Sequence, residues 1–412
     1  MVFKDISFII EIAKRVILDK AYLDKLFFHY YKNFVNKEFV KFSISVLFRD
    51  IYFAEDIIKR YLKDYKKLPI EISLILYLGS ILIKRSKYPY YVILNELVEF
   101  TKRKYSIKYS KLVNAVLRRI LNDGNYEFNF SLLPQKSFYY KKLYEFYQDE
   151  QYFSIVKQII FVDSEKYRKG GFFVDFLKYN SLDYLEASKY SDTYFYIKNV
   201  NDFPKEFLEK FVFQDIGNHL LMKYFSYFYK NKNSLTLEIA SYPGGKSFYL
   251  FSNTIHNDFR LWKVNKLKQR LKDNNRLYIC SDGRALPFKN ESFDYVFLDT
   301  PCTGSGVVKT KVDIIYHLNR NDYIKLRKMQ KKMLKEAWRV LKKGGFLFYS
   351  TCSIFKDENE RRIEDFLRKN NRGYLVTNEN FNREFIYKDK YFFTIKKFEE
   401  MDGIFGAVLL KT

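Results

Sequence analysis

The first part of the chain shows the periodicity of amphipathic helices and almost none of the alternation typical of strands. Between residues 112 and 121, apolar side chains recur three or four positions apart, which places them on one face of a helix. Asn122-Asp123-Gly124 then predicts the end of this helix, because glycine suits a left-handed cap. The most apolar run, Leu68 to Ile83, is shorter than the roughly 20 residues of a membrane span and predicts a buried helix. We therefore expect an all-α domain over residues 1–125.

Later parts of the chain show a mixed pattern. Residues 126–230 contain short segments, such as Gly171-Phe172-Phe173-Val174, that predict a small α/β region. From residue 231 onward, strands alternate with helices. Strands are predicted at 235–239, 294–298 and 346–349, and a long amphipathic helix at 321–341. This alternation predicts a parallel, doubly wound sheet over residues 231–412, with ligands bound at the carboxyl ends of its strands.

The net charge narrows the choice of partners. The 412 residues include 73 Lys and Arg against 48 Asp and Glu, a net charge of +25. Residues 1–135 alone carry 24 basic and 14 acidic side chains, or +10 (24 − 14). This excess favours nucleic acid as a partner, and a merely basic, solvated surface is the alternative. Several cations of two neighbouring predicted helices form either one basic binding face or an ordinary solvated face: Lys102, Arg103, Lys104, Lys108, Lys111, Arg118 and Arg119.

The cysteine content and the first residues of the chain indicate in which cellular compartment the protein is expected. Three cysteines are too few for a disulfide framework, so a reducing environment is expected. Met1-Val2-Phe3-Lys4-Asp5 leads into an amphipathic stretch carrying Glu11 and Lys14, unlike the apolar core of a signal peptide. We expect a cytoplasmic protein without a membrane, metal or obligate protein partner.

A glycine-containing segment follows the first predicted strand of the C-terminal region. Glycines within 238–246 let the backbone approach a nucleotide-like ligand, although the segment matches neither a dinucleotide-binding motif nor a P-loop. Asp258 lies twenty residues after Glu238 (258 − 238), where an acid at a strand end can accept hydrogen bonds from both ribose hydroxyls. Asp282 follows a third short strand and could meet an adenine. Any one of these acids could cap a loop, but three at successive strand ends indicate a cofactor site.

Two of the three cysteines also follow predicted strands. Cys302 lies in Asp299-Thr300-Pro301-Cys302, and Cys352 in Ser350-Thr351-Cys352-Ser353. Because the carboxyl ends of parallel strands open onto the ligand cleft, we predict that these two cysteines are reactive. A lone cysteine is otherwise a small buried apolar side chain, and Cys280 is predicted to be such a core residue.

These motifs resemble those of the RsmB (Sun-type) ribosomal RNA cytosine-C5 methyltransferases. The resemblance is dense from Asp294 to Phe366. It includes Leu298–Cys302, Gln330–Leu341, Tyr349–Ile354 and Glu358-Asn359-Glu360, and it extends to Phe213-Gln214-Asp215 and to a last strand at Asp402–Ala407. In the N-terminal part, Leu94–Val98 and Val113–Arg119 resemble the NusB-like helical domain of the same enzymes.

The resemblance implies a multidomain chain with three parts. Residues 1–125 correspond to an all-α, NusB-like RNA-binding domain, and residues 126–230 to a linker with a small α/β RNA-binding subdomain. Residues 231–412 correspond to a Rossmann-like methyltransferase domain that uses S-adenosyl-L-methionine. Small-subunit ribosomal RNA is the implied substrate.

The resemblance also implies a role for each reactive residue. Cys352, as a thiolate, would attack C6 of a cytosine taken out of its RNA context, which activates C5. Asp299 would hold a proton at or near N3. Cys302 would assist removal of the C5 proton and release of the enzyme. A thiol titrates near pH 8.5, so Cys352 needs local positive charge or hydrogen bonds, and Lys246 is a candidate for the charge.

The implied cofactor contacts involve three strand ends. They are Ala240, Ser241, Tyr242, Pro243, Gly244, Gly245, Lys246, Asp258, Asp282 and Asp299. The family usually has Asp at the position of Glu238 and Cys-Ala-Ala in place of Ala240-Ser241-Tyr242. The segment from Lys246 to Asp258 is also short, so the helix after the loop is expected to be cut to about two turns. We expect a divergent but active enzyme.

Two other functions remain open at this point. One is a transfer RNA cytosine-C5 methyltransferase, since only the NusB-like resemblance favours ribosomal RNA. The other is a non-catalytic RNA-binding assembly factor descended from such an enzyme, which would not need Cys302, Cys352, Asp299 or Lys246.

Overall fold

The computed structural model describes residues 3–123, 130–160, 170–173, 185–197, 211–273, 275–370, 372–378, 381, 386–387, 392–395 and 401–412. Contacts divide the chain into two units. The first, here called the helical unit, contains residues 1–160 and 310–319, and the second, the sheet unit, contains residues 161–309 and 320–412. The three-part division predicted from the sequence remains a prediction, but helices of residues 130–160 group with the helical unit.

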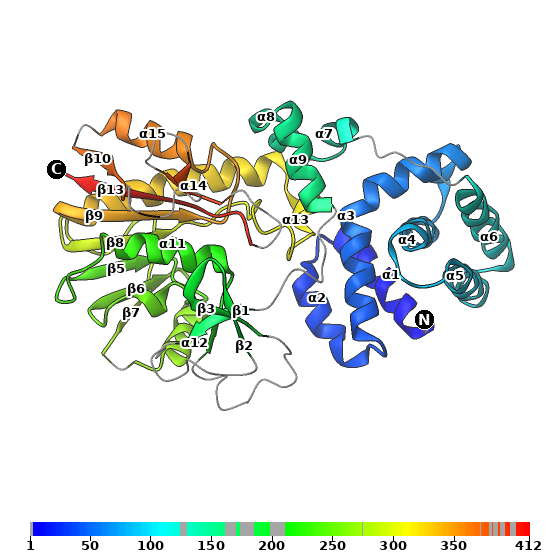
Figure 1. Ribbon diagram of the computed structural model, residues 1–412, viewed down its shortest axis with the longest axis horizontal. Helices are drawn as coiled ribbons and strands as arrows, with labels where there is room; N and C mark the ends of the chain where they lie inside the picture. Colours follow the sequence, from blue (N-terminus) through cyan, green and yellow to red (C-terminus); the bar gives the residue numbers. More distant parts are fainter. Residues whose placement is uncertain are drawn as a thin grey trace. The chain divides into compact units, whose positions relative to one another are not determined.

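The helical unit contains α-helices joined by short turns (Figure 1). They are α1 (Phe3–Leu18), α2 (Leu23–Tyr30), α3 (Lys37–Tyr61), α4 (Ile70–Arg85), α5 (Tyr90–Lys104), α6 (Ile107–Asn122), α7 (Leu133–Lys136), α8 (Phe138–Phe146), α9 (Asp149–Ile160) and α13 (Ile314–His317), with 3-10 turns η1 (Tyr31–Asn33), η2 (Tyr65–Lys67) and η3 (Phe130–Leu132). The helix predicted at 112–121 is confirmed as part of α6, which ends at Asn122, while Gly124 lies outside the described residues.

Helix α4 is buried along most of its length, as its apolar sequence predicts. Gly79 lies at its centre, although glycine is unfavourable inside a helix. A Cβ atom at this position would lie 2.6 Å from Leu117 of α6 and 3.0 Å from Leu97 of α5. Gly79 therefore allows α4 to approach both helices closely.

Helix α13 comes from the C-terminal half of the sequence but completes the helical unit. Val312 and Tyr316 pack in the core of this unit. The Ser137 hydroxyl donates to the carbonyl of Ile315 (2.8 Å), and the Asp313 carboxylate accepts from the backbone N–H of Leu23 (3.2 Å). Residues 310–319 are thus bonded to the unit that residues 1–160 form.

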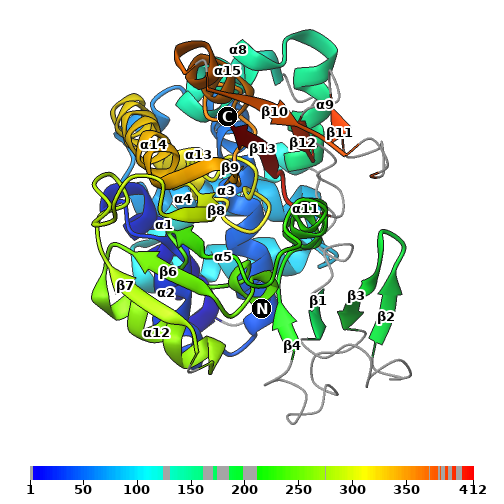
Figure 2. The same ribbon diagram turned by 90° about the vertical axis from the view of Figure 1, so that its left-hand side faces the viewer.

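The sheet unit begins with a small antiparallel sheet. It consists of β1 (Gly170–Phe173), β2 (Leu185–Ser188), β3 (Ser191–Ile197) and β4 (Phe211–Phe213), in the order β2-β3-β1-β4 (Figure 2). Strand β1 contains Gly171, Phe172 and Phe173 of the segment that suggested a small α/β region, and Val174 lies outside the described residues.

The larger sheet has the order β11-β12-β13-β9-β8-β5-β6-β7, with β10 paired to β13. Its strands are β5 (Thr236–Ile239), β6 (Thr254–Asp258), β7 (Leu277–Cys280), β8 (Phe293–Asp299), β9 (Leu341–Thr351), β10 (Gly373–Val376), β11 (Ile386–Tyr387), β12 (Phe392–Thr394) and β13 (Phe405–Lys411). The predicted parallel arrangement holds for β7, β6, β5, β8 and β9. The rest of the sheet is antiparallel, because β13 returns against β9 and pairs with β10 and β12.

Helices cover both faces of this sheet, as the side chains of β8 require. Successive residues of a strand point to opposite faces. Tyr295 and Phe297 pack in one core with α11 (Ile216–Ser226), whereas Val296 and Leu298 pack in another with α14 (Arg320–Val340). Figure 2 shows α11 and α14 on opposite sides of the strands. The remaining helices are α12 (Leu261–Leu271) and α15 (Glu360–Lys369).

Two local expectations are wrong. The helix of about two turns after the glycine-containing loop is reduced to one 3-10 turn, η5 (Ser247–Tyr249), because only four residues separate its end from β6 (254 − 249 − 1). Cys280 is exposed and not a core residue, because β7 is the last strand at its end of the sheet order. Among the residues that the structure describes, no helix is both long and apolar enough to cross a membrane.

Candidate active site

The loops after β5 and β8 leave the sheet where its strand order reverses. From β5 the chain continues to β6 on one side, whereas β8 lies on the other side of β5. In open α/β sheets, ligands bind at the carboxyl ends of the strands at such a point. The predicted cofactor loop follows β5, and Asp299 ends β8.

Lys246 and Asp299 form an ion pair at this position. Nζ of Lys246 lies 2.7 Å from Oδ2 of Asp299, and the lysine side chain is 15% exposed. The other carboxylate oxygen, Oδ1, accepts a hydrogen bond from the hydroxyl of Ser350 on β9 (2.8 Å). Both oxygens of Asp299 therefore have a fixed partner, and three neighbouring strand ends meet in one group of contacts.

Cys302 and Cys352 lie side by side although fifty positions separate them in the sequence (352 − 302). Their sulfur atoms are 3.1 Å apart. Strands β8 and β9 are parallel neighbours, so the loops that follow them emerge at the same edge. A backbone hydrogen bond from Gly306 to the carbonyl of Cys352 (2.9 Å) joins the two loops.

The surroundings shift the pKa values of the two thiols in opposite directions. The pKa of Cys352 is lowered, mainly because the Cys302 thiol donates a hydrogen bond to it, and the charge of Lys246 adds to this effect. The pKa of Cys302 is raised well above its ordinary value by the same hydrogen bond and by burial. Since the thiolate is the nucleophilic form, these pKa shifts favour Cys352 over Cys302 as the nucleophile.

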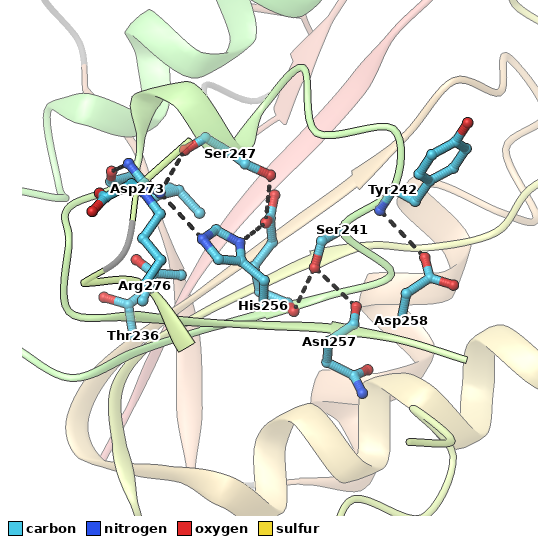
Figure 3. Close-up of polar contacts among 12 residues, drawn as sticks. Thr236, Ser241, Tyr242, Ser247, His256, Asn257, Asp258, Asp273 and Arg276 are labelled. Carbon is cyan, nitrogen blue, oxygen red and sulfur yellow. Dashed lines mark hydrogen bonds and ion pairs between the residues drawn. The ribbon is translucent and has the colours of Figure 1, made fainter. Parts of the chain in front are cut away.

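Asp258 lies at the end of β6, as predicted, and touches the glycine-containing loop. Its side chain is buried, and Oδ2 accepts from the backbone N–H of Tyr242 at 3.3 Å (Figure 3). Nζ of Lys263 lies 3.5 Å from Oδ1 of Asp258. The ring of Tyr242 packs edge-to-face against Trp262 with ring centroids 5.4 Å apart. The bulky Tyr242 is thus accommodated beside the loop.

Other predicted cofactor residues have partners in the protein. Asp282 pairs with Arg284 (2.7 Å), which lowers the pKa of this carboxyl group. The hydroxyl of Ser241 donates to the carbonyls of Glu238 and Asn257, and the carbonyl of Pro243 accepts from Arg270. Ala240 packs against the core that lies between the sheet and α14. Gly244 has a φ of +89°, a conformation that favours glycine.

A buried polar network supports the shortened loop (Figure 3). Oε2 of Glu238 lies 2.6 Å from Nδ1 of His256 and accepts from the hydroxyl of Ser247 (2.7 Å). Nη1 and Nη2 of Arg276 donate to the carbonyls of Ser247 (3.0 Å) and Leu250 (2.7 Å). The network therefore holds both ends of η5.

Two family models match parts of this chain. Residues 228–410 match the family model described as 16S rRNA methyltransferase RsmB/F. This part of the chain is thus similar to the RsmB/F methyltransferases and is here called the RsmB/F-family domain. Residues 18–122 match the NusB family, and this part of the helical unit is here called the NusB-family domain.

Curated relatives of this chain share the name ribosomal RNA small subunit methyltransferase B. The protein from Vibrio cholerae is 30% identical over 210 residues, which are 48% of this chain and 45% of that protein. The protein from Photorhabdus laumondii is 32% identical over 152 residues, 35% of each chain. The alignments thus span less than half the length of these relatives.

Solved structures share the fold of this chain. The crystal structure of the protein PH0851 has a TM-score of 0.70 at 19% identity and covers 100% of this chain and 99% of that one. A methyltransferase homolog protein from Pyrococcus horikoshii has a TM-score of 0.52 at 19% identity, covering 66% of this chain and 94% of that one. At these identities the similarity concerns the fold alone.

The structure brings together Lys246, Asp299, Cys302 and Cys352, as the sequence predicts. Asp282, a predicted cofactor residue, pairs with Arg284. Glu358 belongs to a motif that resembles the family, but no role was predicted for it, although this buried carboxylate contacts the loops of both cysteines. Glu358 lies two residues before the charged amphipathic helix α15 (360 − 358), and this position in the sequence gives no sign of such contacts.

Proposed function

We propose that this chain is an RNA (cytosine-C5)-methyltransferase that acts on small-subunit ribosomal RNA, with S-adenosyl-L-methionine as the methyl donor. The observation that carries the proposal is the 3.1 Å contact between Cys302 and Cys352 beside the pair of Lys246 and Asp299. A non-catalytic RNA-binding protein has no need of a thiol pair with opposite pKa shifts. The name of the curated relatives favours ribosomal RNA over transfer RNA.

The residues at the strand ends fit S-adenosyl-L-methionine. Asp258 offers carboxylate oxygens for ribose hydroxyls, and Gly244 and Gly245 add no side chains of their own to the loop. Asp282 provides an acceptor for an adenine amino group. When bound, the cofactor supplies an electrophilic methyl group on a sulfonium. Ala240 to Lys246, Asp258, Asp282 and Asp299 are the residues that we propose to hold it.

Cys352 begins the reaction in this proposal. Its thiolate forms a bond to C6 of the cytosine, and the electron pair of the C5–C6 double bond moves toward C5, which becomes the nucleophile for the methyl group. Asp299 lies next to the thiols and holds a proton at or near N3, which makes C6 more electrophilic. Lys246 stabilises the thiolate before attack and orients Asp299 through their ion pair.

Cys302 completes the reaction. Its pKa is raised mainly by the hydrogen bond that it donates to Cys352. Once Cys352 is bonded to C6, it no longer carries the charge that holds this proton, so Cys302 can lose the proton to solvent. The Cys302 thiolate then removes the C5 proton, the electron pair restores the C5–C6 double bond, and Cys352 leaves as a thiolate.

RNA binding in this proposal uses the basic face of the NusB-family domain. Its seven cations, named in the sequence analysis, are all exposed on α5 and α6. Arg103 pairs with Glu99, and Arg118 donates a hydrogen bond to Asn114. Both contacts are exposed, so the two guanidinium groups remain at the surface. Proteins that neutralise phosphates with such side chains lose affinity steeply as salt increases.

The test is incubation of the purified chain with small-subunit ribosomal RNA and methyl-labelled S-adenosyl-L-methionine, followed by nucleoside analysis. We expect labelled 5-methylcytosine, at least roughly a thousandfold less in Cys352→Ala, and an unchanged amount in Cys280→Ala, whose thiol lies on the exposed strand β7. If label appears only with transfer RNA, transfer RNA takes the place of ribosomal RNA as the proposed substrate. A chain that binds RNA but no cofactor would support the assembly-factor function.

A further inference from the structure

Glu358 connects the loops of both cysteines. Oε1 accepts from the backbone N–H of Thr303 (3.0 Å), and Oε2 accepts from the Thr303 hydroxyl (2.6 Å) and from the hydroxyl of Ser353. Thr303 follows Cys302 and Ser353 follows Cys352, so one carboxylate holds the residue directly after each cysteine. The Glu358 side chain is completely buried.

Burial raises the pKa of the Glu358 carboxyl, and the hydrogen bonds that it accepts oppose this shift. The hydroxyl of Ser353 accepts from the backbone N–H of Phe355 (3.0 Å), and its proton is directed to Glu358. The side-chain amide of Gln330 donates to Oε1 (2.8 Å). Four donors thus converge on the two oxygens of Glu358, as an acceptor-only carboxylate requires.

The residues before each cysteine are held by the same cluster. Gln330 also donates to the carbonyl of Pro301, directly before Cys302 (3.0 Å). Asn359, next to Glu358, accepts from the hydroxyl of Thr351, directly before Cys352 (2.6 Å), and donates to the carbonyl of Ser353 (2.7 Å). Each cysteine is therefore clamped on both sides through Gln330, Glu358 and Asn359.

We infer that Glu358 is a positioning residue, which sets the distance between the two cysteines and adds a negative charge behind them. The inference rests on the proposed function for its catalytic meaning, but the geometry itself can be tested without RNA. A shift of about 1 Å in a reacting group can reduce a rate by roughly a hundredfold. A carboxylate that ties two loops from different strands is well suited to prevent such a shift.

Glu358 also influences the ionisation of the thiols. Its charge raises the pKa of both Cys302 and Cys352, against the effect of Lys246 on Cys352. The titratable groups that face Cys352 are Cys302, Asp299, Lys246 and Glu358, and the phenols of Tyr323 and Tyr349 lie near Glu358. Removing the charge of Glu358 therefore lowers the pKa of Cys352, whereas loss of positioning lowers the rate at every pH.

The experiment compares Glu358→Gln with Glu336→Gln in the full chain. Glu336 is a matched control, since it also accepts from a backbone N–H, that of Leu286, and pairs with Arg339 away from the cysteines. In a Cys302→Ala background, we expect Glu358→Gln to slow covalent adduct formation with RNA by roughly tenfold to a hundredfold. Cofactor affinity should stay unchanged in both variants.

Alkylation of Cys352 by iodoacetamide, followed by peptide mass spectrometry, tests the inference without RNA. We expect the pH midpoint of alkylation to move lower in Glu358→Gln and to stay in place in Glu336→Gln. Thr303→Val should show a partial loss of adduct rate, and Thr303→Ser, which keeps the hydroxyl, should behave like the unmodified chain.

The possible results are distinguishable. If Glu358→Gln alters neither the adduct rate nor the alkylation midpoint, or if Glu336→Gln alters both equally, Glu358 has no positioning role. If the unmodified chain makes no 5-methylcytosine but Glu358→Gln alone moves the midpoint and changes the alkylation rate above it, the proposed function fails and the action of Glu358 on the thiols stands. Should Glu358→Gln not fold, the comparison of Thr303→Val with Thr303→Ser decides, and equal adduct rates there would overturn the inference.

Discussion

Lys246, from the loop after β5, and Asp299, at the end of β8, form an ion pair with 2.7 Å between Nζ and Oδ2. Both charges act on Cys352, with opposite sign: Lys246 lowers the pKa of the thiol, and Asp299 raises it. The pair therefore adjusts the thiolate fraction of the neighbouring cysteine, while the Cys302 hydrogen bond provides the main effect.

We predict that the two members of this pair shift the reactivity of Cys352 in opposite directions. Alkylation needs the thiolate, so its rate rises with pH through the pKa of Cys352, below the ordinary thiol value of about 8.5. Lys246→Met should move the midpoint up by roughly one pH unit, and Asp299→Asn should move it down. The measurement is iodoacetamide labelling of the Cys352 peptide across pH. Shifts in the same direction would contradict the assigned electrostatics.

Cys302→Ala should trap a covalent complex between Cys352 and RNA. Attack and methyl transfer precede the step that needs Cys302, so the variant should accumulate the intermediate. The complex should appear as a slow-migrating band on denaturing gels. Cys302→Ala/Cys352→Ala is the control and should give no band. Absence of the band in the single variant, with RNA still bound, would remove the release role from Cys302.

Arg276→Ala should destabilise the shortened cofactor loop. Its guanidinium is the donor to the carbonyls of Ser247 and Leu250, and the side chain is 11% exposed. Leaving such acceptors without a partner costs about 1–3 kcal/mol, which urea unfolding can measure. Arg361→Ala, which removes an exposed pair with Asp357, should change stability by less than about 1 kcal/mol. Equal losses in the two variants would mean that the loop does not depend on Arg276.

Reversal of charge on the NusB-family domain should weaken RNA binding. We predict that Lys104→Glu/Lys108→Glu/Lys111→Glu reduces affinity at low salt and flattens the dependence of affinity on salt, since fewer counterions are released. Lys325→Glu/Lys328→Glu/Lys332→Glu, on α14, is the control for net charge. If both triple variants bind equally well, the cations of α5 and α6 form an ordinary solvated face.

Local sequence patterns predicted much of the fold and the reactive residues. The period of apolar positions predicted α4 and α6, and buried strands such as β8 follow from unbroken apolar runs. Cys302 and Cys352 were predicted to lie at the ligand cleft because each follows a parallel strand. In these cases the information lies within a few residues of the position concerned.

Features that depend on distant partners could not be predicted. Cys280 is exposed because of the place of β7 in the sheet order, which short segments do not encode. The single turn η5 needs Arg276, which lies beyond β6 and α12 in the sequence. The role of Glu358 depends on donors from three separate segments. Each feature needs the tertiary structure to become visible.

Helix α13 limits how the helical unit can be separated from the rest of the chain. Val312 and Tyr316 belong to the core of the helical unit, yet they are encoded between the loop of Cys302 and α14. A gene fragment that ends at residue 160 would therefore yield a helical unit with part of its core exposed. Recombination that exchanges only the first part of the gene would have to keep its new core compatible with residues 310–319. The two units are thus bound to evolve together, because each contains sequence that interrupts the other.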